Sequence, residues 1–129
     1  MFTTTMMGRL AVSCLALLLV GGALLSACAE APATEPVARG AQVYRQKSCA
    51  SCHAINGSGG RIGPPLTHVG TVAQTRQPGT TARDYLRSSI TDPGGYIVPG
   101  FPDSMSRGLA RGLSDADLDA LVRYLLSLR

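Results

Sequence analysis

The run Cys49-Ala50-Ser51-Cys52-His53 places two thiols and one imidazole close together in the chain. Two residues between the cysteines bring both sulfur atoms within reach of the two vinyl groups of a single porphyrin. The side chain that follows can rise over the face of the ring and ligate the iron. C-x-x-C-H is typical of the covalent attachment of one haem c, so we expect Cys49, Cys52 and His53 to hold this cofactor.

Three other kinds of site can use the same cysteine pair. A redox-active C-x-x-C pair is typical of a βαβ context, and no strand pattern flanks Cys49 and Cys52. A structural zinc ion takes four ligands, but the chain has no second such cysteine pair, and His68 is its only other histidine. A plain disulfide would leave His53 unexplained. Haem attachment accounts for the whole run, and these alternatives stay open.

The composition indicates one small domain that is short of core. The 129 residues are 45% hydrophobic but only 5% aromatic, without Trp. The net charge of +4 is small and the basic residues are scattered singly, which disfavours nucleic-acid binding. Residues 57–102 contain nine Gly and six Pro, a composition that favours loops able to wrap a flat apolar ligand. We therefore expect the haem to supply the missing buried surface.

The N-terminal segment is typical of an export signal. Arg9 precedes an uncharged run over 10–25, which is shorter than the roughly 20 residues of a membrane span. Leu25-Ser26-Ala27-Cys28 resembles a bacterial lipobox, so we expect residues 1–27 to be removed and Cys28 to be lipidated. Residues 28–35 would form a flexible tether. An ordinary signal peptide and an uncleaved anchor are the alternatives.

These features predict an extracytoplasmic protein of a bacterial cell envelope, held to a membrane by the lipid on Cys28. The choice between the inner and the outer membrane stays open.

Met105 is the methionine expected to complete the haem site. Iron in electron carriers commonly takes His and Met on opposite faces of the haem. The other methionines lie in the expected signal peptide, and Met105 lies in a segment without helical or strand periodicity. We expect it to ligate the iron opposite His53. His68 is the rival ligand, and an ordinary half-buried role for Met105 is the other alternative.

Three segments carry helical patterns. Good helix formers occupy 37–47, and Thr81 predicts the start of a short helix that ends at Ile90. The range 114–128 begins with the N-cap residue Ser114 and carries one apolar stripe. The fold class expected is all-α, with three to five helices and long Gly/Pro-rich loops wrapped around one haem.

Residues 36–129 resemble the class I c-type cytochromes. The resemblance is carried by the C-x-x-C-H run and by Gly63-Pro64-Pro65-Leu66, which matches a Gly-Pro-x-Leu segment of the family. Further matches lie in the opening helix (Gly40 and Tyr44) and in the closing helix (Leu121 and Tyr124). The resemblance implies that these two helices cross at the glycine. It also implies that the carbonyl of Pro64 accepts a hydrogen bond from the ring of His53, which would fix its orientation.

The function expected is one-electron transfer between redox protein partners of a respiratory chain, at an extracytoplasmic membrane surface. Axial ligands on both sides of the iron would leave no open position, so we expect no catalysis by the chain itself and no small-molecule substrate. Short sequence motifs around 88–105 are similar to those of cytochrome c domains associated with terminal oxidases and nitric oxide reductases. The alternative is therefore a haem-carrying electron-entry subunit of such a complex. A haem-based gas sensor or peroxidase would need an open or labile sixth site.

Overall fold

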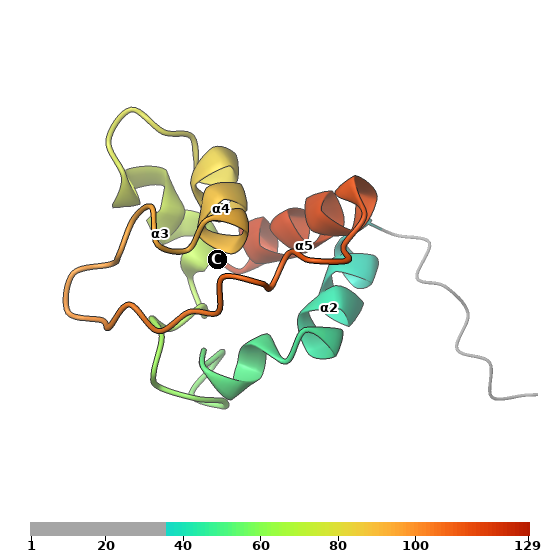
Figure 1. Ribbon diagram of the computed structural model, residues 1–129, viewed down its shortest axis with the longest axis horizontal. Coiled ribbons are helices and arrows are strands. Elements are labelled where there is room, and N and C mark those ends of the chain that lie inside the picture. Colours follow the sequence, from blue (N-terminus) through green and yellow to red (C-terminus); the bar gives the residue numbers. More distant parts are fainter. Residues whose placement is uncertain (1–35) are drawn as a thin grey trace, which may run out of the picture. The chain divides into compact units, whose positions relative to one another are not determined.

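The computed structural model describes residues 36–129, and the expected signal peptide, Cys28 and the tether lie outside the described residues. The described elements, in chain order, are α2 (Pro36–Gln46), the short 3-10 helix η1 (Cys49–Ser51), α3 (Val69–Arg76), α4 (Ala82–Thr91) and α5 (Asp115–Ser127) (Figure 1). This part of the chain contains no strand beyond an isolated bridge between Ile55 and Ser58. The all-α prediction is confirmed. No helix within 36–129 is long and apolar enough to cross a membrane.

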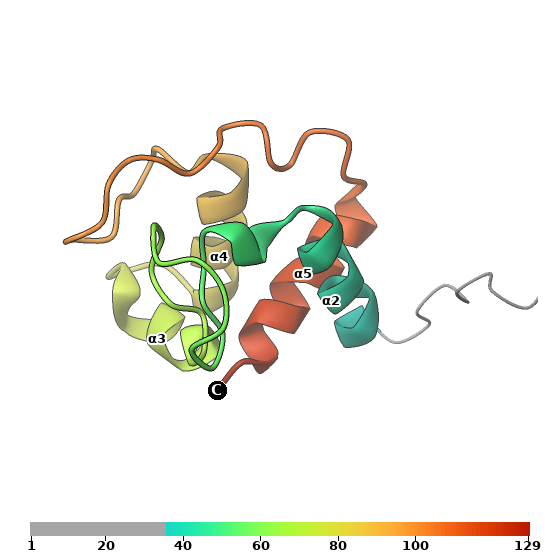
Figure 2. The ribbon, with the colours of Figure 1, turned by 90° about the horizontal axis from the view of Figure 1, so that it is seen from below.

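Helices α2 and α5 cross in close contact, as Figures 1 and 2 show from two directions. The backbone of Gly40 lies directly against the carbonyl of Ala120, so that a Cβ atom at position 40 would overlap it. One turn further along, the rings of Tyr44 and Tyr124 pack with their centroids 5.5 Å apart and their planes tilted by 57°. The crossing that the family resemblance implies is thus present, and it places the end of α2 and the cysteine run over the core.

We expect Gly40→Ala to destabilise the protein. In an exposed helix this change would stabilise by about 1 kcal/mol, but here the added methyl group meets the backbone of α5, and we expect a loss of about 1–3 kcal/mol. Denaturant unfolding of the haem-loaded protein measures the effect. Gly108→Ala is the matched control, because a Cβ atom there meets only the far end of Arg111, at 4.0 Å. Equal stabilities of the two variants would contradict the close crossing.

Two N-caps begin the later helices as predicted. The Thr81 hydroxyl accepts a hydrogen bond from the backbone N–H of Asp84, and the Ser114 hydroxyl accepts one from that of Asp117, both at 3.1 Å. Each cap satisfies an amide that the helix itself leaves without a partner. The predicted helices over 37–47, 81–90 and 114–128 are therefore confirmed to within a residue or two.

Helix α3 was not predicted individually, because its apolar residues follow no helical period. Tertiary contacts explain its presence instead. Val69 and Ala73 are buried in the core, and the backbone N–H of Gly70 donates to the carbonyl of Leu128 at 2.8 Å. A Cβ atom at Gly70 would overlap the carbonyl of Leu126, so the glycine permits this contact with the end of α5.

The core lies between the four α-helices. Its buried members are Val43, Tyr44, Val69, Ala73, Tyr85, Leu86, Ile90, Leu118, Leu121, Val122 and Leu125. Residues 92–114 form no helix and cross from the end of α4 to the start of α5 (Figure 2). This long segment and the cysteine run both contribute residues to the wall of one cavity.

An ion pair between α2 and α5 gives the fold a specific dependence on acid. Arg39 donates to the carboxylate of Asp117 at 2.7 Å, and this bond, followed by that of Ser114, lowers the pKa of Asp117 below its ordinary 3.8. A lowered folded-state pKa contributes stability that is present above about pH 4 and is lost as the pH falls through the folded value. Asp117→Asn should therefore give a shallower fall in urea midpoint between about pH 4 and pH 2.

Asp115→Asn is the control for the fall in urea midpoint at acidic pH. Asp115 lies in the same first turn of α5, but its side chain is 95% exposed although it pairs with Arg87. Both variants remove one negative charge near the helix N-terminus, so the difference between them compares the bonds of Asp117 to Arg39 and Ser114 with the exposed pair of Asp115 and Arg87. If Asp117→Asn left the fall in urea midpoint at acidic pH unchanged, the stabilising role of the Asp117 carboxylate would be contradicted.

Candidate functional site

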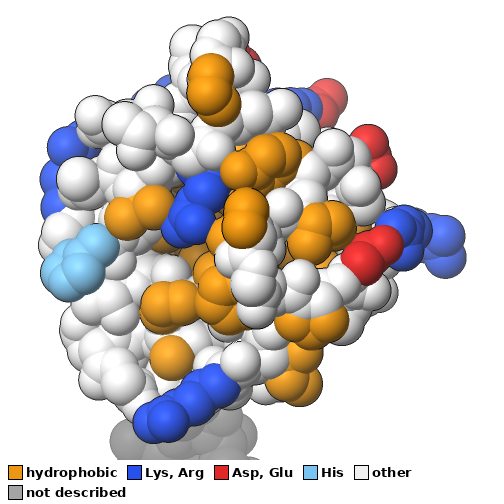
Figure 3. All heavy atoms as spheres, turned by 90° about the vertical axis from the view of Figure 1, so that its left-hand side faces the viewer, with side chains coloured by type: hydrophobic (Ala, Val, Ile, Leu, Met, Phe, Trp, Pro, Cys, Tyr) orange, Lys and Arg blue, Asp and Glu red, His pale blue; other side chains and the backbone are white. Residues whose placement is uncertain are grey.

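A cavity of about 270 Å³ opens between the cysteine run and the 92–114 segment. Its walls are mainly aliphatic and aromatic, and they include Leu66, Leu86, Ile90, Val98, Phe101 and Leu125. Figure 3 shows hydrophobic side chains gathered in the middle of one face of the molecule, with basic side chains among them. A mostly apolar cavity in a domain with so few aromatic residues suits a large flat ligand.

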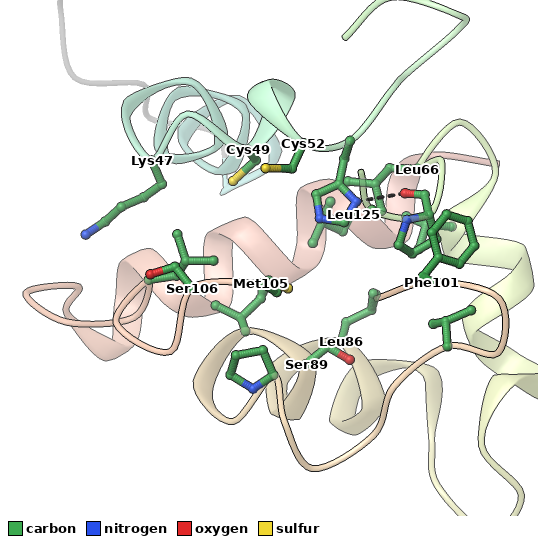
Figure 4. Close-up of a pocket in the computed structure, with 18 of the residues that line it drawn as sticks. Lys47, Cys49, Cys52, Leu66, Leu86, Ser89, Phe101, Met105, Ser106 and Leu125 are labelled. Atoms are coloured by element: carbon green, nitrogen blue, oxygen red, sulfur yellow. Dashed lines mark hydrogen bonds between the residues drawn. The ribbon is translucent and has the colours of Figure 1, made fainter. Parts of the chain in front are cut away.

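The two cysteines present their sulfur atoms to this cavity from the first residue of η1 and from the residue that follows it. The turn closes through hydrogen bonds from the backbone N–H groups of Cys52 and His53 to the carbonyl of Cys49, at 3.2 and 3.1 Å. Figure 4 shows the sulfur atoms of Cys49 and Cys52 side by side at the edge of the cavity. They form no disulfide, and burial raises the pKa of the Cys49 thiol. The geometry suits attachment of both sulfur atoms to one ligand.

His53 is held in one orientation by the segment that follows it. Its Nδ1 atom lies 2.7 Å from the carbonyl oxygen of Pro64, drawn as the dashed line in Figure 4. A carbonyl can only accept, so Nδ1 carries the proton and Nε2 keeps its lone pair for a metal. A Cβ atom at Gly63 would overlap the ring, and the absence of a side chain there makes room for the imidazole. The hydrogen bond from the ring to Pro64 is the one that the resemblance implied.

Tyr44 supports the same turn from α2. Its hydroxyl donates to the backbone carbonyl of His53 at 3.4 Å, and its ring lines the cavity. Burial is the main reason why the pKa of Tyr44 rises to about 12. The hydroxyl therefore stays protonated and able to donate throughout the neutral range.

Met105 lines the same cavity from the 92–114 segment, across from the two cysteines in Figure 4. The rival ligand His68 is exposed at the start of α3 and is not among the residues that line the cavity. The structure thus brings Cys49, Cys52, His53 and Met105 together and leaves His68 outside.

The described part of the chain does not support a structural zinc site or a thioredoxin-like redox pair at the cysteine run. Within residues 36–129, no three His, Cys, Asp or Glu side chains are grouped so that they could hold a metal ion. Residues 36–129 form four α-helices and no strand, so this part of the chain provides no βαβ context for a thioredoxin-like pair. The residues present instead fit a haem: two neighbouring thiols, an imidazole with a free lone pair, a thioether and an apolar cavity.

Sequence reasoning missed the cavity-lining residues Arg76 and Tyr96, which belong to no motif. Gly63 and Tyr44 lie within the motifs that carry the resemblance, but their contacts with His53 depend on the three-dimensional fold.

Comparison with known proteins identifies the family of the chain. Residues 37–129 match the family model described as Cytochrome c. Cytochrome c oxidase subunit 2 of Alkalihalophilus pseudofirmus is 31% identical over 109 residues, which are 81% of this chain and 29% of that relative. The chain therefore spans less than a third of that protein's length. The chain belongs to the cytochrome c family, whose members bind haem c covalently and transfer electrons.

Proposed function

We propose that the chain is a one-electron carrier that holds a single haem through thioethers at Cys49 and Cys52, with Nε2 of His53 and the sulfur of Met105 as axial ligands. When bound, the haem supplies reversible Fe(III)/Fe(II) chemistry. The observation that carries the proposal is the convergence of a histidine with a fixed ring and a methionine on one cavity beside two thiols.

Each of these residues has a distinct task. The two cysteines keep the cofactor from being lost outside the cytoplasm. The carbonyl of Pro64 fixes the tautomer of His53 and makes the imidazole a stronger donor. The neutral sulfur of Met105 favours the reduced iron and so raises the reduction potential. With protein ligands on both sides, no position stays open for a substrate, and the chain itself performs no catalysis.

A spectroelectrochemical titration tests this function. The purified protein should follow a one-electron Nernst curve, and its oxidised form should show the near-infrared band of Met–iron ligation. A protein without this band, which binds CO or peroxide at once, would instead be a sensor or a peroxidase.

A second candidate is a haem-carrying electron-entry subunit of a terminal oxidase or nitric oxide reductase, with catalysis in another chain. The 31% identity to a cytochrome c oxidase subunit 2 favours it. Both candidates use redox proteins as partners. Gentle detergent extraction followed by native mass analysis separates them: a fixed ratio to integral subunits indicates the subunit, and recovery alone indicates the mobile carrier.

We further propose that residues 1–27 export the chain, that Cys28 carries the lipid, and that residues 28–35 tether the domain at 36–129 to a bacterial membrane. Cys28→Ser should release the haem protein from washed membranes into the soluble extracytoplasmic fraction, because a lipid anchor contributes about 0.8 kcal/mol for each buried methylene. Cys14→Ser, within the expected signal, is the control and should leave the protein bound. Tight membrane association of the Cys28→Ser variant would indicate an uncleaved anchor.

A further inference from the structure

The segment that carries Met105 has little backbone support of its own. In the described residues, the nearest backbone hydrogen bonds run from Ser104 to the carbonyl of Pro102 at 3.0 Å and from Leu109 to that of Ser106 at 3.4 Å. Among the backbone hydrogen bonds described for 36–129, none is made by Met105 itself. Segments with few such bonds open easily, so another contact must hold this methionine in place.

A side-chain ion pair spans Met105. Arg107 donates to the carboxylate of Asp103 at 2.7 Å, and these residues lie two positions after and two positions before the methionine. The residues between them are not helical, so the pair closes a small loop with Met105 at its middle.

The same arginine rests on the turn that follows α4. A Cβ atom at Gly94 would overlap the guanidinium group of Arg107, which shows that the group lies directly on the Gly94 backbone. The hydrogen bond to Asp103 and, more weakly, the charge of Asp92 raise the pKa of Arg107. The guanidinium therefore stays charged and joins the Met105 loop to residues 92–94, immediately before Tyr96 and Val98 of the cavity wall.

We propose that Arg107, paired with Asp103 and seated on Gly94, is a positioning residue that holds Met105 over the cavity and so sets how often the sixth ligand leaves the iron. This inference rests on the proposed ligation by Met105. The pair lies at the surface, with side-chain exposures of 62% for Arg107 and 45% for Asp103. Exposed pairs contribute little to global stability, so the effect should fall on the methionine loop.

CO binding to the reduced haem protein is the test. CO needs the position that Met105 would occupy, and its apparent affinity rises in proportion to the fraction of molecules in which that position is free. We expect Arg107→Gln to raise this affinity about 2- to 5-fold, the range of an exposed ion pair. Arg107→Lys should restore part of the difference, and Gly94→Ala should reproduce the increase by displacing the guanidinium.

Arg111→Gln is the matched control, because it removes one positive charge from the same segment without touching the pair. It should leave CO affinity unchanged, and the urea midpoints of all these variants should stay close to that of the native protein. Equal CO affinities of the native protein and Arg107→Gln would overturn the inference. If Met105→Ala also left CO affinity unchanged, the ligation by Met105 would itself be wrong, so the two failures can be told apart.

Discussion

Replacing both Cys49 and Cys52 by Ala is expected to abolish covalent haem attachment completely. The two thiols lie side by side at the cavity and are the only cysteines among residues 36–129. Without the haem, the mostly apolar cavity of about 270 Å³ would remain as a void or fill with water, and such voids are strongly destabilising. Haem staining of a denaturing gel should show no signal, and circular dichroism should show a large loss of helix.

Substitutions in the same turn control for this result. Ala50→Ser and Ser51→Ala change exposed positions of η1 between the two cysteines. Both variants should retain normal haem staining and normal helix content. A double cysteine variant that still carried covalent haem would show that the attachment lies elsewhere in the chain.

Replacing Met105 by Ala should open the sixth coordination position. We expect the near-infrared Met–iron band to disappear and the reduction potential to fall by on the order of 100 mV, because the axial ligand is a principal determinant of haem potential. Reduced protein should bind CO readily. Near-infrared absorption and potentiometry of the oxidised and reduced forms measure these changes.

Met105→His separates loss of a ligand from loss of sulfur. A second imidazole would keep the iron six-coordinate and exclude CO, while the potential would still fall relative to the thioether. A near-infrared band that survived in Met105→Ala would rule out Met105 as the ligand.

Local sequence signals predicted those helices that have local causes. Thr81 and Ser114 are N-caps that act within a few residues of the chain, and their hydroxyls accept the expected amide hydrogen bonds. The apolar stripe of α5 needs no knowledge of its neighbours. These elements could therefore be bounded to within a residue or two.

Helix α3 could not be predicted in this way. Its stability depends on Gly70, which approaches the backbone of α5 and donates to the carbonyl of Leu128. A contact between residues 70 and 128 leaves no periodic signal in the eight residues of the helix. Tertiary packing commonly outweighs local preference in this manner.

The residues of the candidate site likewise include some that local sequence indicates and others that only the tertiary fold brings together. Cys49, Cys52 and His53 are adjacent in sequence, and their spacing alone indicates their chemistry. Met105 was predicted by exclusion of other methionines, and its place at the cavity required the fold. The seating of Arg107 on Gly94 depends on how the 92–114 segment folds back on itself, which no spacing reveals.

The pyridine haemochrome spectrum of the purified protein, together with acidic acetone extraction, shows whether two thioethers hold one haem at this cavity. We expect the absorption of a haem with both vinyl groups saturated, one haem per chain, and no colour in the extract. An extractable haem with intact vinyl groups, or no haem at all, would contradict this attachment.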